Sequence, residues 1–175
     1  MGTRLKSEFE RQLAERLPQF RAARDAVLRD AGRVFHWHVS GSCHVFILLL
    51  LSRRDNEFTI ELAWTTDTEF PPDLPLMNPI DMPQFRLRRD MPKDGRFRFR
   101  LAGLFHPRGE FWWPASSRRQ FTDWVHGGSG APGPAAAPAD DDALLVAAVA
   151  AAIEAIERHG MPYLSMSLNL AKEST

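Results

Sequence analysis

The feature that most constrains the fold is a strictly alternating segment in the middle of the chain, at residues 96–101, which reads RFRFRL. Three arginines alternate there with Phe97, Phe99 and Leu101. A period of two places the arginines on one side of an extended backbone and the apolar side chains on the other. The pattern therefore predicts a strand, extending to about residue 104, with one face on a core and a basic outer face.

Three further segments upstream have the composition of strands and are separated by short polar turns. They span residues 33–40, 43–51 and 57–65. The first and third alternate, whereas the second is apolar on both faces, which is typical of a central strand. Because the connections are short, we expect an antiparallel meander.

Helices are expected at both ends of the chain. Apolar residues recur every three to four positions over residues 4–31, which predicts one bent helix or two short ones that end at Gly32. Asp140 and the two aspartates after it are expected to cap a second helix that runs to about His159 and ends at Gly160. Residues 163–168 are then expected to form a short strand or an extended tail.

These elements predict an α+β fold, with an antiparallel sheet of four to six strands and the N-terminal and C-terminal helices packed on one face. The length of 175 residues fits a single domain over residues 1–175. Residues 67–95 contain many prolines and are expected to be a loop. Residues 127–139 are rich in Gly, Ala and Pro, which predicts a flexible linker before the C-terminal helix.

Charge and cysteine content restrict the classes of function. The chain has 22 basic and 22 acidic residues, so its zero net charge gives no overall attraction to nucleic acid, which we expect not to be a partner. The apolar run at residues 45–51 is too short to span a membrane, and we see no secretory signal. A single cysteine fits a reducing compartment, so we expect a cytoplasmic protein.

The first candidate site is formed by Arg96, Arg98 and Arg100, which we call the arginine row. Its members could pair with glutamates on a neighbouring strand as a structural ladder, or they could form a partner-binding surface. Nucleic-acid binding is a third alternative, although a stacking platform would need the phenylalanines on the arginine face. One tryptophan of the pair Trp112–Trp113 is expected in the core, and the other as a lid or an exposed anchor. The residues that we predict for partner binding are Arg96, Arg98, Arg100, Glu57, Glu61 and Trp113.

The second candidate site is a cluster of His36, His38, Cys43 and His44, with His106 as a further candidate. Cys43 and His44 are neighbours on a strand and point to opposite faces, so they cannot both join. The set that we select, His36, His38 and Cys43, would suit zinc. Two histidines at this spacing share a strand face, and a hairpin would bring Cys43 opposite His38. The alternative is that these are ordinary sheet-surface and turn residues. No HExxH or CxxC motif and no Walker loop is present. We therefore assign no catalytic residue and expect no cofactor, and a metal-dependent enzyme remains an alternative function.

The order of these features resembles a family of bacterial domains of unknown function, the DUF4304-like proteins. The resemblance covers roughly residues 5–165. It rests on the strands at 35–39 and 58–64, on Arg98, Leu101, Gly103 and Leu104, on the tryptophan pair, and on the segment His159-Gly160-Met161-Pro162. It implies an α+β fold and a place among small bacterial defence or toxin-neutralising proteins.

The function predicted from the sequence is therefore a small bacterial protein-binding module. An immunity protein that neutralises a cognate toxin is its most specific form. The alternatives are the metal-dependent enzyme and the nucleic-acid binder described above.

Overall fold

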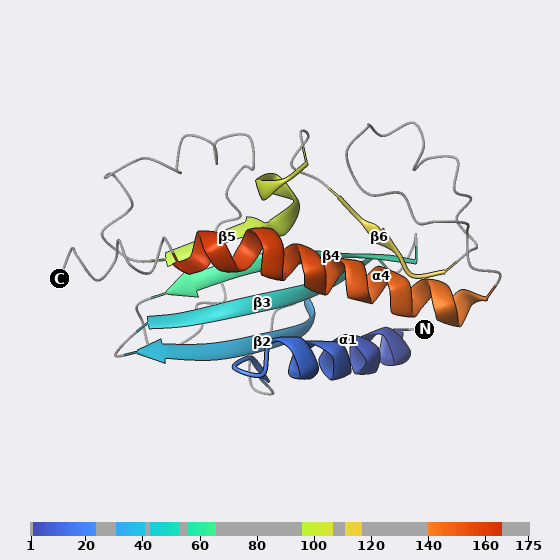
Figure 1. Ribbon diagram of the computed structural model, residues 1–175, viewed down its shortest axis with the longest axis horizontal. Coiled ribbons are helices and arrows are strands. Elements are labelled where there is room, and N and C mark those ends of the chain that lie inside the picture. Colours follow the sequence, from blue (N-terminus) through green and yellow to red (C-terminus); the bar gives the residue numbers. More distant parts are fainter. Residues whose placement is uncertain are drawn as a thin grey trace.

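An antiparallel sheet forms the centre of the molecule (Figure 1). The computed structural model describes residues 2–23, 31–40, 43–52, 56–65, 96–106, 111–116 and 140–165. The elements are α1 (Gly2–Arg16), β1 (Arg21–Ala22), β2 (Ala31–Ser40), β3 (Cys43–Ser52), β4 (Glu57–Thr65), β5 (Arg96–Arg100), the 3-10 turn η2 (Leu101–Leu104), β6 (Trp113–Pro114), α4 (Asp141–Ala155) and the π-helical turn η3 (Ile156–Gly160).

The strands follow the order β1-β2-β3-β4-β5, with every pair antiparallel. β3 is central, as its apolar composition predicts. β5 pairs with the last five residues of β4, whereas the short β6 pairs with its first two, Glu57 and Phe58. The predicted α+β class and the antiparallel sheet are therefore confirmed.

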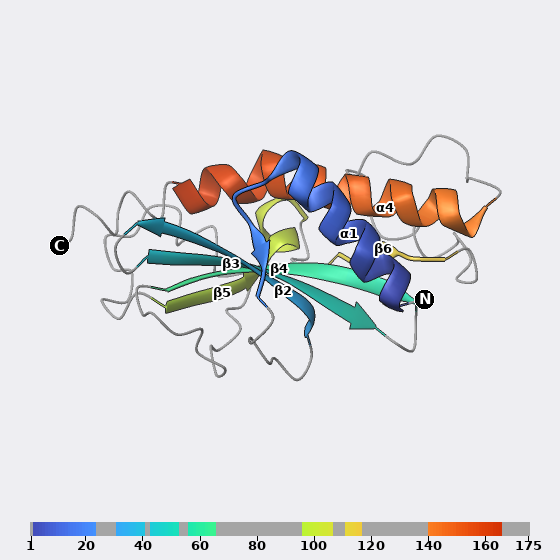
Figure 2. The same ribbon diagram turned by 90° about the horizontal axis from the view of Figure 1, so that it is seen from below.

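Both helices lie on the same side of the sheet, as expected (Figure 2). Their apolar side chains meet alternate residues of the strands in one large core, which includes Phe9, Phe35, Ile60, Phe99 and Val149. Burial of such side chains is the main stabilising contribution to a fold of this size.

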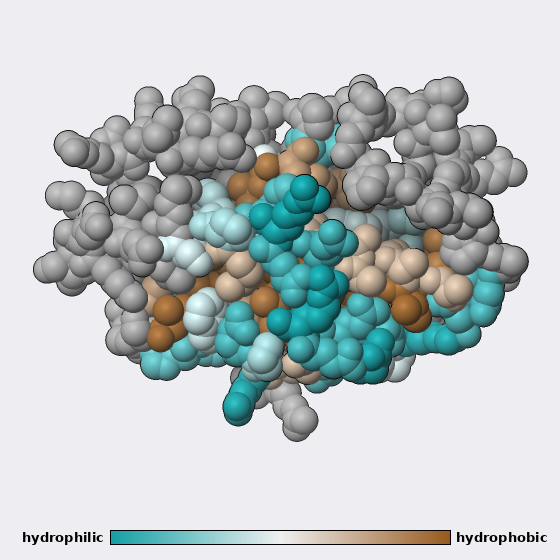
Figure 3. All heavy atoms as spheres, viewed as in Figure 1, coloured by the Kyte–Doolittle hydropathy of each residue, from teal (hydrophilic) through white to brown (hydrophobic). Residues whose placement is uncertain are grey.

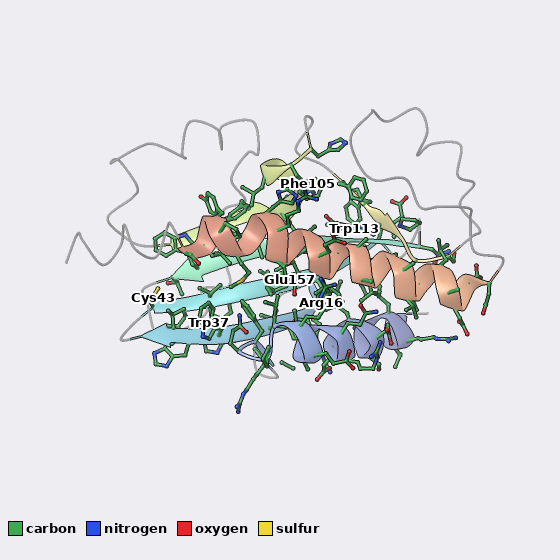
Figure 4. All side chains as sticks on the ribbon, in the orientation of Figure 1. Arg16, Trp37, Cys43, Phe105, Trp113 and Glu157 are labelled. Atoms are coloured by element: carbon green, nitrogen blue, oxygen red, sulfur yellow. The ribbon has the colours of Figure 1, made fainter. Side chains whose placement is uncertain are left out.

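The helices α1 and α4 run side by side and in the same direction. Arg4 of α1 pairs with Asp142 at the beginning of α4, and Gln12 donates to the carbonyl oxygen of Val146 at 3.2 Å. Arg16 reaches Glu157 just beyond the end of α4 (Figure 4). Residues early in α1 contact the beginning of α4, and residues late in α1 contact its end, so the two helices are parallel.

The helical prediction for residues 4–31 is wrong at residues 17–23 and at Ala31, and residues 24–30 lie outside the described ranges. The backbone turns around Pro18, since the residue before a proline is disfavoured in a helix, and then forms strand β1 beside β2. Gly32 does not end a helix but lies inside β2, where an added Cβ would approach Leu51 Cγ at 2.6 Å. The pairing of β1 with β2 and the close packing around Gly32 therefore determine the structure here, and not the local helical pattern.

The predicted end of the C-terminal helix is also wrong. Asp140 caps α4 as expected, because its carboxylate accepts from the backbone N–H of Asp142 at 3.0 Å. Gly160, however, is helical, and helix continues over residues 161–165 in place of the expected strand or tail. A Cβ at Gly160 would lie 2.8 Å from Leu62 Cδ1, so this glycine permits a close approach of helix and sheet.

The predicted end of one strand is also wrong. The strand expected over 96–104 ends at Arg100, because Leu101–Leu104 turn inward as a 3-10 segment that buries Leu101. The loop predicted at 67–95 and the linker predicted at 127–139 lie outside the described residues.

Candidate functional site

The arginine row contains a buried ion pair with Glu61, as the structural-ladder alternative predicts. Arg98 Nε lies 2.6 Å from Glu61 Oε2, and Arg100 Nε lies 3.7 Å from Glu61 Oε1. Glu61 is only 1% exposed, and its neighbours on that face of β4, Thr59 and Ala63, are equally buried. The sequence pattern did not show that this pair is enclosed.

The prediction that Glu57 pairs with the arginines of this ladder is wrong. Antiparallel pairing sets Glu61 opposite Arg100, and Arg96 opposite Thr65 at the end of β4. Glu57 lies at the other end of β4, opposite Pro114 of β6, beyond the reach of β5. The ladder thus contains one glutamate between two arginines, and a binding role for its members stays a prediction.

Trp113 is a core residue and not an exposed anchor. It is 4% exposed and packs against Phe58 and Phe111, with ring centroids 5.7 and 4.9 Å apart. Its neighbour Trp112 is half-buried, and the guanidinium of Arg100 lies 5.8 Å from the centroid of its ring. Sequence alternation correctly separated the two tryptophans but did not show which one points inward.

The proposed zinc ligands do not meet. Cys43 is paired with Ser40 across the hairpin and packs against the main core on the helix side, near Trp37 (Figure 4). His36 lies on the opposite face, because side chains alternate along β2. The combination of His36, His38 and Cys43 is therefore wrong. Within the described ranges, no group of three or more His, Cys, Asp or Glu side chains is arranged to hold a metal ion.

The residue that joins the two histidines is His44. The register pairs His38 with His44 and His36 with Phe46, so all four side chains share one face of β2 and β3. His36 Nε2 and His44 Nδ1 are 2.8 Å apart, which is a hydrogen bond between imidazoles. Burial lowers the pKa of His36 and of His44, and the neighbouring histidines lower both further. The register of the hairpin, which the sequence alone did not give, decides that His44 and not Cys43 shares a face with the two histidines.

A second surface feature, which the sequence prediction missed, is the outer side of α4. Only three of its fifteen residues, Asp141, Asp142 and Glu154, are polar, and all three lie near its ends. The side that faces away from the sheet carries exposed apolar residues, which we call the α4 outer face: Ala143, Val146, Ala147 and Ala151. Figure 3 shows tan and brown side chains gathered over the N-terminal half of this helix. The sequence feature that could have identified this surface is the unbroken apolar composition of residues 143–153.

This composition is unusual for a helix at the surface, where charged or polar residues normally occupy the outer side. Val146 is 43% exposed and is the one large hydrophobic residue found exposed in the part of the chain that the structure describes. The polar groups flank the apolar strip, with Asp140 at one end and Glu154 and Arg158, all exposed, toward the other. A dry centre with a polar rim is the usual anatomy of a protein interface.

No helix among the described segments combines the length and the apolar character needed to cross a membrane.

Comparison with known proteins gives no match: no family model fits the chain, and neither a curated protein nor a solved structure is significantly similar to it. The resemblance to DUF4304-like domains therefore stays a prediction.

Proposed function

We propose that this protein is a protein-binding module that binds its partner through the α4 outer face. The observation that carries the proposal is that α4 is apolar around its circumference, yet the described residues pack against only one of its sides. Leu145, Val149 and Ile153 are buried against the core, whereas Val146 and Ala147 face outward. Helices that are apolar on all sides are normally buried on all sides.

The partner that fits this face is an apolar helix of another protein. Three of the four outer-face side chains are alanines, so the backbone of a second helix is able to approach closely. No charged side chain lies between Asp142 and Glu154, so nothing on this strip selects a nucleic acid or a charged peptide. Specificity would come from the polar rim, as at other protein interfaces.

The immunity-protein hypothesis is the more specific form of the same proposal. A cognate toxin would present the apolar helix, and binding would block the toxin by covering it. Support for this form would be a toxin whose activity is inhibited by the wild-type protein but persists with a variant altered at the α4 outer face.

The proposal is tested with Ala147→Glu, which places a charge at the centre of the α4 outer face. The matched control is Ala14→Glu, which changes an alanine exposed on α1 in the same way. Tagged wild-type protein and both variants are used for affinity capture from the native host, and the proteins retained are quantified by mass spectrometry. Circular dichroism establishes that the variants are folded.

We expect a partner that wild type and Ala14→Glu retain equally and that Ala147→Glu retains at least about tenfold less, since an unpaired buried charge costs several kcal/mol. Equal retention by all three proteins, or no retained protein at all, would refute the assignment of this face.

A further inference from the structure

Four aromatic rings form a column across β2 and β3 on the face away from the helices. In order they are Phe46, His36, His44 and His38, and we call them the ring column. Successive ring centroids are 4.9, 5.1 and 4.8 Å apart, and the planes of neighbouring rings differ by 16° to 22°. The ring planes are nearly parallel, and His36 and His44 lie edge to edge, because a hydrogen bond between two ring nitrogens lies in the plane of the rings. Within the described residues, no third His, Cys, Asp or Glu side chain joins these two nitrogens as a metal ligand would.

The ring column is held together in a way that depends on its protons. A hydrogen bond joins His36 Nε2 and His44 Nδ1, so one of these rings donates and the other accepts through an unprotonated nitrogen. The other nitrogen of His44, Nε2, is buried and has no hydrogen-bond partner in the structure. A first additional proton can be shared between the two rings, but a second one removes the acceptor.

The charged residues of β1 and β4 that the structure describes beside His36 and His44 do not compensate a positive charge on these two rings. Arg21 of β1 is exposed and lies directly opposite His36, so it adds a further cation on this face. On the other side, His44 lies opposite the uncharged Thr65 of β4. Two acidic residues lie on this face of the described strands. Glu61 is already engaged by Arg98 and Arg100, and Glu57 lies at the far end of β4, opposite Ser52 and Pro114.

We propose that the ring column makes the β2–β3 hairpin proton-sensitive, so that this part of the sheet is stable while the imidazoles are neutral and loosens when they are charged. Protonation of both His36 and His44 places two like charges in adjacent, partly buried rings and breaks their hydrogen bond. The inference concerns the opposite face from α4 and does not depend on the proposed function.

The direction of the effect follows from the shifts described above. The pKa of His36 and of His44 in the folded protein is below the ordinary value of 6.5, which applies to the unfolded chain. Between these values the unfolded chain binds more protons than the folded one, so acid favours unfolding. The stability is present above pH 6.5 and is lost as the pH falls through and below that value.

The first experiment follows the imidazole protons of the wild-type protein by NMR as the pH is lowered. We expect His36 and His44 to titrate below the ordinary histidine range. Titration of both rings at or above it would overturn the proposal, whatever the behaviour of any variant.

The second experiment measures urea unfolding at about pH 7.5 and about pH 5.5, over which each such histidine raises the unfolding constant by up to about tenfold. His44→Phe keeps a ring in the column but removes its proton site, and we expect most of the acid effect to disappear. The control His106→Gln removes a histidine elsewhere, on the segment after η2, and should retain the wild-type acid effect. An acid effect unchanged in His44→Phe would contradict the proposal.

Discussion

The two faces of the sheet are built from alternate residues of the same strands, yet they differ in chemistry. The face under α1 and α4 is almost wholly apolar and belongs to one large core. The other face carries a small apolar cluster of Val34, Phe46, Leu48 and Ala63 beside a buried ion pair and the ring column. The first face is stabilised mainly by packing, whereas the second depends also on charge and protonation.

This difference indicates which face of the sheet is more sensitive to pH and to changes of charge. On the helix side, the ion pairs between α1 and α4 lie at the outside of the helices and are partly exposed. On the other side, Glu61 is enclosed within the sheet. A charge therefore matters much more on the second face, because water does not screen it there.

The largest effect is expected from Phe9→Ala on the helix face. Phe9 is fully buried and lies 5.4 Å from Phe35, ring centroid to centroid. Its removal leaves a cavity between α1 and the sheet and should lower the free energy of unfolding by about 3–5 kcal/mol. Urea denaturation measures the loss, with Val146→Ala as an exposed control near zero. A loss below about 1 kcal/mol would mean that α1 contributes little to the core.

The next effect is expected on the opposite face, from Glu61→Leu. This change leaves Arg98 partly buried without its carboxylate and should cost about 3 kcal/mol in the free energy of unfolding. The double variant Glu61→Leu with Arg98→Leu should be more stable than the single one, because no uncompensated charge remains. A double-mutant cycle by denaturation tests this, and strict additivity would show that the two residues are not coupled.

A smaller effect is expected where the helix layer meets the sheet most closely, from Gly160→Val. The new side chain would meet Leu62 and Leu101, whose Cδ1 atoms lie 2.8 and 3.2 Å from the position of an added Cβ. Overpacking should reduce the free energy of unfolding by about 2 kcal/mol, as measured by thermal and urea unfolding. Unchanged or increased stability would show that Gly160 is retained for another reason.

The smallest effect is expected from Glu157→Ala, which removes the partner of Arg16 between the helices. Both side chains are about one-third exposed, so the change should cost no more than about 1 kcal/mol. The effect should shrink further in high salt, which screens exposed pairs but not the pair at Glu61. Equal losses for Glu157→Ala and Glu61→Leu would remove the proposed contrast between the two faces.

Periodicity in the sequence was sufficient for β2, β3 and β4, whereas β1 was predicted as helix and β5 as a longer strand. The boundaries of β4 were predicted to the residue, and β3 nearly so, because alternation and polar turns are local properties of a chain. The cap at Asp140 was predicted for the same reason. The α+β class follows from these elements, since an antiparallel meander with one apolar face needs helices to cover it.

The candidate sites depended on information that a linear pattern does not contain. Which side chains share a face was decided by the hairpin register, which places His44 beside His36 and separates Cys43 from both. The burial of Trp113 and Glu61 was decided by how strands and helices pack, and not by residue type. Gly160 reads as a helix stop in the sequence, but it is a contact point in the fold.

Local patterns in the sequence therefore predicted most of the helices and strands and the class of the fold, because backbone periodicity and capping act over a few residues. The tertiary structure was needed to show that the arginine row contains a buried pair, that three histidines share one face, and that the α4 outer face is exposed. These features depend on strand register and on how helices and strands pack, which are set by the free energy of the whole fold.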